Sequence, residues 1–139
     1  MAIFKFRLQT VLEYREMQES WAKDAYLDAR AARVSAEDIV LAIRTKRGEM
    51  IESTPSEINA RRNLEWMLIR LDDQERDQNH VVSVLGVEEM NALAAWQNQK
   101  RDLETLVKLR DNELAEWNLE ENRREQRELD EWAVMRHSA

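Results

Sequence analysis

A single apolar stripe runs through the first third of this chain and constrains its fold more than any other feature. Alternating steps of three and four residues from Leu8 to Met50 meet thirteen positions, of which ten are apolar. This spacing persists over about six heptads, more than the three or four that mark a coiled-coil helix. We therefore predict one long helix whose buried stripe is Leu8, Val11, Arg15, Gln18, Ala22, Ala25, Ala29, Ala32, Ala36, Ile39, Ile43, Lys46 and Met50.

Five consecutive members of this stripe are alanine. Small side chains let a partner helix approach closely and leave room for its larger side chains. The chain offers such a partner near its other end, where large residues recur at helical spacing and the register then shifts. That second stripe consists of Leu93, Trp96, Lys100, Leu103, Val107, Arg110, Leu114 and Trp117, followed by Leu129 and Trp132.

Helix breakers are rare and divide the chain clearly. It contains two Gly and one Pro, and 35% of its residues are charged, a composition that favours long helices over sheets. Within the segment 53–57, Thr54 can cap a new helix, Pro55 suits the first helical position and Glu57 completes a capping box. We expect helices over 4–52, 55–79 and 87–135, with a turn or weak helix at 80–86.

These elements predict an all-α fold: a long two-stranded antiparallel coiled-coil hairpin with one or two shorter helices in the central connection, forming a single domain over 1–139. The small residues of the first helix meet the large ones of the last if paired residue numbers add up to about 139 or 140. A register that turns at 80–86 would leave the first part of the chain unpaired, so we reject it. The chosen register pairs Ala22 with Trp117, Ala25 with Leu114, Ala32 with Val107, Ala36 with Leu103, Ile43 with Trp96, Leu8 and Val11 with Trp132 and Leu129, and Arg15 with Glu125.

The middle helix carries two apolar faces. Its main stripe contains Ile58, Leu64, Leu68 and Leu71, and a second face contains Trp66, Met67 and Ile69. A large second face on a slender helix requires an explanation. Either this helix packs between two neighbours, or the second face docks another protein.

Several classes of function are disfavoured by charge and composition. The net charge is −7 with basic residues interspersed, which argues against a nucleic-acid partner. No apolar run approaches the roughly 20 residues that a membrane crossing needs, and the charged N-terminus is unlike a signal peptide. The absence of Cys excludes a disulfide scaffold and a Cys-ligated metal and suits the cytosol.

Signals for catalysis or cofactor binding are nearly absent. Gly48 and Gly86 stand too far apart for a phosphate-binding loop, and there is no Cys nucleophile. Asp77 and His80 have the spacing of one metal-binding pair on a helix, but a di-iron bundle needs two Glu-x-x-His motifs with further carboxylates. His137 has no such neighbour. We predict no enzyme activity, no cofactor and no metal.

Both ends of the chain resemble a known family. The opening motif Phe4-x-Phe6-x-Leu8-Gln9-x-Val11-Leu12-x-x-Arg15 is similar to the start of the flagellar type III export protein family FliJ. The closing residues resemble that family's C-terminal signature and comprise Glu121, Asn122, Arg123, Asp130, Glu131, Ala133 and Arg136. The resemblance is sharp at the two ends and only architectural between them.

The resemblance implies a non-enzymatic component of the flagellar export apparatus at the cytoplasmic face of the inner membrane. Members of the family act as a coiled-coil stalk in the hexameric export ATPase, contact the cytoplasmic domain of the export-gate membrane protein and hand over export chaperones. The ATPase-binding residues so implied are Phe4, Phe6, Leu8, Gln9, Arg15, Glu121, Asn122, Arg123, Asp130, Glu131 and Arg136.

The gate-docking surface is predicted from patterning alone. We place it near the other end of the hairpin, at Trp66, Met67 and Ile69, with Val40 of the first helix extending it. Two alternative functions remain open. The chain can be the equivalent stalk of a virulence-type injectisome, or a generic coiled-coil scaffold that buries Trp66, Met67 and Ile69 in an oligomer.

Overall fold

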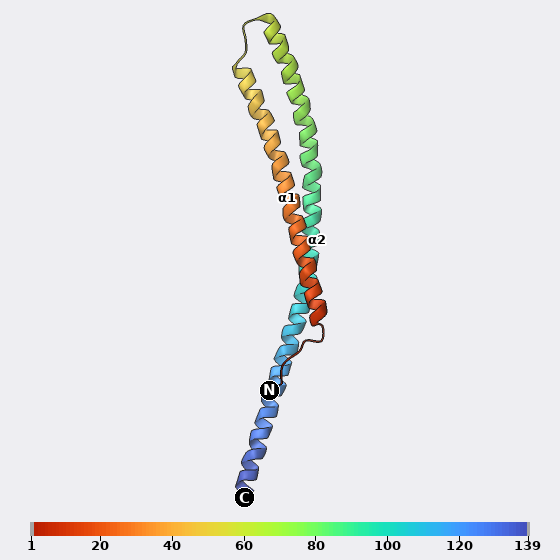
Figure 1. The fold of residues 1–139 in the computed structure, drawn as a ribbon, viewed down its shortest axis with the longest axis vertical. Coiled ribbons are helices and arrows are strands. Elements are labelled where there is room, and N and C mark those ends of the chain that lie inside the picture. Colours follow the sequence, from red (N-terminus) through yellow and green to blue (C-terminus); the bar gives the residue numbers. More distant parts are fainter. Residues whose placement is uncertain (1, 139) are drawn as a thin grey trace. The chain divides into compact units, whose positions relative to one another are not determined.

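The computed structural model describes residues 2–138 and contains two α-helices (Figure 1). Helix α1 spans Gln9–Glu52, with 44 residues, and α2 spans Ile58–Ser138, with 81 residues. Within the described residues there is no strand. The predicted all-α helical hairpin is confirmed.

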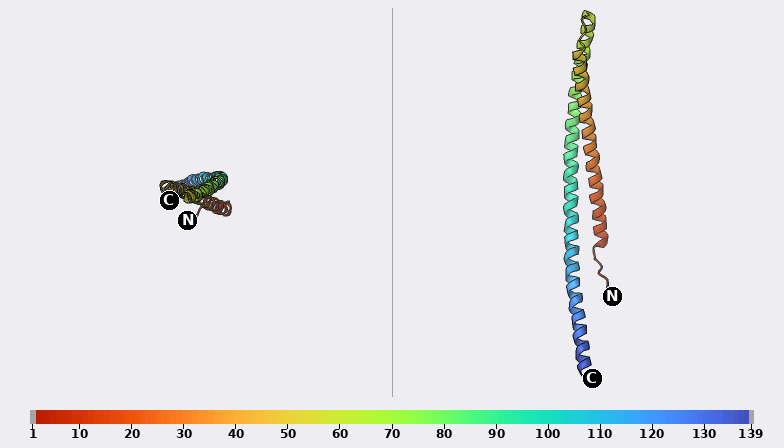
Figure 2. Two further views of the ribbon diagram at one scale, coloured as in Figure 1. Left: turned by 90° about the horizontal axis from the view of Figure 1, so that it is seen from above. Right: turned by 90° about the vertical axis from the view of Figure 1, so that its left-hand side faces the viewer.

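The chain forms two compact units. The loop unit comprises Trp21–Gln97, and the terminal unit comprises the residues up to Ser20 together with those from Asn98 onward. In the loop unit α1 and α2 run antiparallel on either side of the turn at 53–57, as Figures 1 and 2 show. Its most buried side chains are Ala36, Val40 and Leu71.

Polar pairs fix the register of the loop unit. Arg33 forms an ion pair with Glu89, and Arg47 Nε lies 3.2 Å from Asp72 Oδ1. Hydrogen bonding to Glu89 raises the pKa of Arg33 above its ordinary value, so this guanidinium remains charged. Because an antiparallel pair of this kind forms only in one alignment, each pair penalises sliding of one helix along the other. Three further contacts follow the same alignment: Arg44 Nε to Glu75 Oε1 at 2.7 Å, Gln78 Nε2 to the Ala36 carbonyl at 3.2 Å, and the stacked rings of Tyr26 and Trp96 at 5.5 Å.

The predicted interruption of the second half of the chain is wrong. Residues 80–86 are helical, so the expected helices over 55–79 and 87–135 are parts of the single helix α2, and no shorter helix lies in the connection. A glycine inside a helix costs about 1 kcal/mol relative to alanine. Partial burial of neighbouring Val82 and Leu85 offsets that cost, so the β-branched stretch ending at Gly86 stays helical.

The predicted helix starts are also wrong. Helix α1 begins at Gln9 instead of residue 4, and α2 begins at Ile58 instead of Pro55. The hydroxyl of Thr54 donates to the carbonyl of Ile51 at 2.6 Å, so Thr54 satisfies the end of α1 and does not cap α2. The connection is therefore a short turn, which brings the two helices into a different register from the predicted one.

The alanine stripe is only half correct. The side of α1 that faces α2 shares six positions with the prediction: Arg15, Ala22, Ala29, Ala36, Ile43 and Met50. At five other positions it has the residue that follows the predicted one: Leu12, Tyr26, Arg33, Val40 and Arg47. The displaced members are exposed, and they include Val11, Ala25, Ala32, Ile39 and Lys46. The observed alignment buries larger side chains and pairs two arginines with acids of α2. Burial of these larger apolar side chains stabilises the helix pair more than burial of a row of alanines would, because more apolar area leaves water.

Candidate functional site

The N-terminal residues form a strap that is held against α2 within the terminal unit. Residues 2–6 are not helical, and the backbone N–H of Gln9 donates to the carbonyl of Phe6 at 3.1 Å where the helix begins. From Phe4 to Leu8 apolar and basic residues alternate. Phe6 is 8% exposed, and the ring of Phe4 lies 6.0 Å from that of Trp117 in a tilted arrangement.

Ion pairs and one buried leucine complete this attachment. Arg7 Nε lies 3.2 Å from Glu113 Oε1, and Arg15 Nη1 lies 3.3 Å from Asp102 Oδ2. Leu12 is fully buried, with 0% exposure. The predicted pairing of Arg15 with Glu125, and of Leu8 and Val11 with Trp132 and Leu129, is therefore wrong. The N-terminal motif instead packs against 102–117.

Beyond Trp117, the part of α2 that the structure describes is almost entirely exposed. In Figures 1 and 2 the last turns of α2 extend past the N-terminal strap. We call residues Asn118–His137 the C-terminal tail. All of its side chains are exposed except that of Glu121, which is half-buried. Sequence reasoning placed Leu129 and Trp132 in the seam, but they are 61% and 59% exposed, and Val134 and Met135 are 66% and 71% exposed.

Interactions along the tail support its helical state. Arg127 Nη2 lies 3.2 Å from Glu120 Oε1, and Arg124 forms an ion pair with Glu121 that raises the pKa of Arg124. Such pairs along one side of a helix assist a helical state that the paired part of α2 has already nucleated. The guanidinium of Arg136 lies 5.0 Å from the centre of the Trp132 ring, which adds a cation–π contact.

The structure separates the ATPase-binding residues expected from the family resemblance into two groups. Those of the N-terminal motif are largely engaged: Phe6 is buried, Phe4, Leu8 and Arg15 are half-buried, and Gln9 is exposed with a hydrogen bond to Glu13. Those of the C-terminal signature lie on the tail. Asn122, Arg123, Asp130, Glu131 and Arg136 are exposed and Glu121 is half-buried. The sequence analysis did not predict that the apolar side chains of the tail are exposed. Their position within a charge-rich stretch is the sequence feature that indicates it.

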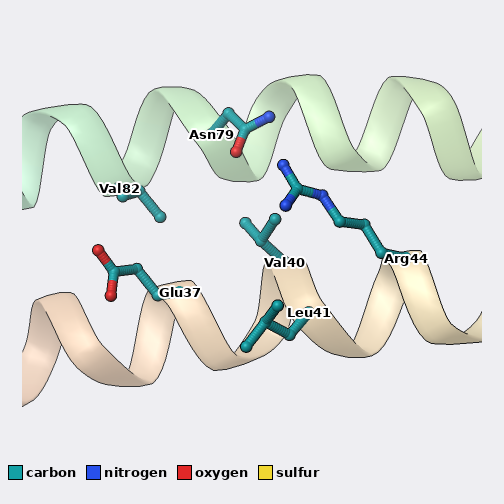
Figure 3. A pocket seen from close by; sticks show the side chains of 6 residues that line it. All are labelled: Glu37, Val40, Leu41, Arg44, Asn79 and Val82. Carbon is teal, nitrogen blue, oxygen red and sulfur yellow. The ribbon is translucent and has the colours of Figure 1, made fainter.

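The gate-docking candidates also fall into two places. Trp66, Met67 and Ile69 are 69%, 47% and 52% exposed on α2, whereas Val40 is 6% exposed within the seam of the loop unit. Figure 3 shows Val40 pointing between the helices at the base of a shallow groove. This groove, lined also by Asn79, lies about 15 Å along α2 from Ile69, since each helical residue rises 1.5 Å. Val40 therefore does not extend the face formed by the other three residues.

The described residues contain no arrangement typical of a metal or membrane site. Within 2–138, no three His, Cys, Asp or Glu side chains come together as a metal site would require. Neither helix has, in that range, a stretch whose length and apolarity would allow a membrane crossing.

Comparison with known proteins identifies one family. The family described as Flagellar FliJ protein matches residues 4–139, which is nearly the whole chain. Comparison with curated proteins gave no match, and neither did comparison with solved structures.

Proposed function

The chain belongs to the FliJ family and is a component of the flagellar export apparatus, and from this premise we propose that its C-terminal tail binds the hexameric export ATPase. The observation that carries this proposal is the tail itself. It is an exposed stretch of helix, and five large apolar side chains lie exposed on it among charges of both signs: Leu119, Leu129, Trp132, Val134 and Met135. Burial of such side chains against another protein would stabilise the complex.

The two parts of the terminal unit have different roles in this proposal. A single helix is about 10–12 Å across with its side chains, so the tail is narrow enough to enter the centre of a ring. The strap and the first turn of α1 pack on α2 before the tail and stiffen its base through the buried side chains of Phe6 and Leu12. We propose that the tail residues make the direct contacts: Glu121, Asn122, Arg123, Asp130, Glu131 and Arg136. Phe4 borders them at the base, against Trp117, whereas Leu8, Gln9 and Arg15 lie further from the tail, with Arg15 paired to Asp102.

A titration of the cognate ATPase tests this function. The steady-state rate of ATP hydrolysis should rise as the protein is added and should saturate near one chain per hexamer, because a central stalk has one site in the ring. The protein itself belongs to a family of non-catalytic export components. A rate that does not change, together with the absence of co-sedimentation with the hexamer, would refute the proposed stalk.

We propose that Trp66, Met67 and Ile69 dock the cytoplasmic domain of the export gate. All three side chains are exposed on one stretch of α2, and such a cluster is unusual on a monomeric surface. From the same family role we also propose that the protein hands over export chaperones and acts at the cytoplasmic face of the inner membrane. The face lies in the loop unit, so a variant can weaken gate binding and leave ATPase stimulation intact.

Replacement of Trp66 by Ser should weaken gate binding by about tenfold or more, since a buried interfacial tryptophan typically contributes at least 1–2 kcal/mol. Titration calorimetry with the purified gate domain measures this change. Trp21→Ser is the matched control, because Trp21 is also an exposed tryptophan of the loop unit but lies on α1. Equal affinities for Trp66→Ser and the wild-type protein would contradict the proposed docking face, as would an equal loss in the control.

A further inference from the structure

A second groove lies between α1 and α2 in the loop unit, close to the turn at 53–57. Both helices contribute to its lining, which consists of Lys46, Met50, Met67, Arg70, Leu71 and Gln74. Its volume of about 230 Å³ is smaller than the roughly 300–1,000 Å³ typical of a small-molecule site. The groove therefore suits one or two side chains of another protein. Met67 belongs both to this groove and to the proposed docking face, so the two surfaces adjoin.

Part of the lining is apolar and accessible. Leu71 is 5% exposed, Met50 is half-buried and Met67 is 47% exposed. Methionine side chains are flexible and adapt to the shape of the group that they contact. An apolar side chain of a partner that packs against Met50 and Met67 would leave water and so stabilise the complex.

The two charged side chains of the groove are both basic. Within residues 2–138, neither Lys46 nor Arg70 forms an ion pair, although acidic residues outnumber basic ones by 28 to 21 in the chain. The groove of Figure 3 differs in this respect. Its Glu37 and Arg44 each pair with a residue of opposite charge, at 2.9 Å and 2.7 Å. Only the groove beside the docking face thus offers cations whose charge is not already matched.

We propose that the segment of the export gate that docks here is acidic: it places an apolar side chain in the groove, and its carboxylates pair with Lys46 and Arg70. The inference rests on the gate docking proposed above and adds the chemistry of the docking segment. An uncharged segment over the groove would take two cations out of water without compensation, and a basic segment would be repelled. An acidic segment supplies the missing counter-charges.

The positions of the two cations also fix where such a segment lies. Lys46 is on α1 and Arg70 is on α2, so carboxylates that reach both would bridge the two helices. The planar guanidinium of Arg70 can hold a carboxylate through two parallel hydrogen bonds, which sets its orientation. Charge pairs of this kind give a docking surface its specificity and its alignment with the partner.

Titration calorimetry with the purified cytoplasmic domain of the cognate gate tests the proposal. Lys46→Glu and Arg70→Glu should each weaken binding by about tenfold or more, because a carboxylate then faces the acidic segment. The melting temperature should stay at the wild-type value, since neither cation forms an ion pair within the described part of the chain. Lys46→Arg, which keeps the charge, should bind as the wild-type protein does. The matched control is Lys23→Glu, the same change at another exposed lysine of α1 in the loop unit.

The dependence on salt separates charge from shape. The loss of affinity in Lys46→Glu should shrink between about 0.1 M and 1 M salt, because the Debye length falls from about 10 Å to about 3 Å. A loss of equal size at both salt concentrations would show that the variant disturbs the fit of the surfaces, and it would overturn the proposed charge pairing.

The same titrations distinguish failure of this inference from failure of the gate docking. If the wild-type protein binds and Trp66→Ser binds weakly, but Lys46→Glu and Arg70→Glu bind like the wild-type protein, the docking face stands and the acidic segment is refuted. An equal loss in Lys23→Glu would also refute it, because net charge and not the groove would then govern affinity. A wild-type protein that does not bind the gate domain would overturn both proposals.

Discussion

Replacement of Leu12 by Ala should lower the free energy of unfolding by about 2–5 kcal/mol, the range found for large-to-small substitutions at buried sites. Replacement of the preceding residue, Val11, by Ala should lower it by no more than about 0.5 kcal/mol, as is usual for exposed positions. Leu12 is 0% exposed and Val11 is 42% exposed. Urea unfolding monitored by far-UV circular dichroism measures both changes.

Comparing the Leu12→Ala and Val11→Ala variants distinguishes between two alignments of α1 with α2. The alignment predicted from the sequence buries Val11 and leaves Leu12 outside the stripe, and the structure has the reverse. The cavity left in Leu12→Ala would lie between the first turns of α1 and α2, next to the strap, whose Phe6 is the nearest buried member of the terminal unit along the chain. Because the strap is short, it has few other contacts that can compensate. Similar losses in both variants, or a larger loss in Val11→Ala, would favour the predicted alignment.

The misplaced half of the α1 stripe shows the limit of counting apolar residues. The predicted stripe and the observed buried side of α1 share every second position. At the remaining positions the observed residue comes one place later in the chain. Both sets therefore have coiled-coil spacing. Ala25 and Ala32 raise the apolar count of the wrong set, and Arg33 and Arg47 lower that of the right one. Both arginines form ion pairs with acidic residues of α2. A count of apolar residues within one helix cannot detect such pairs.

The error in α2 has a different physical origin. Gly86 and its β-branched neighbours have low helix propensity, and the sequence alone favours a break there. Packing along the seam of the loop unit overrides that propensity. Once the break is removed, the turn at 53–57 alone sets the alignment, and the large residues Leu129 and Trp132 lie beyond the reach of α1. The two terminal motifs could be recognised from the sequence. The sequence did not show that the N-terminal motif packs against α2 while the C-terminal one lies on an exposed stretch of helix.

A chain that ends at Asn118 should fail to stimulate the export ATPase and should retain the unfolding free energy of the full chain within about 1 kcal/mol. The side chains of residues 119–137 are exposed apart from the half-buried Glu121, so their loss takes away surface and leaves the packed parts intact. The strap retains its contacts with Trp117 and Glu113, which precede the deletion. Stability and stimulation should therefore separate cleanly in this variant, whereas Leu12→Ala should affect stability first.

Point variants distinguish contact by the tail from a general effect of chain length. Trp132→Glu should reduce stimulation by about tenfold or more, because a charge replaces an exposed apolar anchor and its cation–π partner Arg136 loses the ring. Trp21→Glu is the control, since Trp21 is similarly exposed but belongs to the loop unit. Full stimulation by the truncated chain would show that the ATPase contacts the strap or the loop unit instead. Stimulation lost on truncation but retained in Trp132→Glu would show that charges of the tail carry the contact, and the ion-paired residues Glu120 and Arg127 would then be the ones to change next.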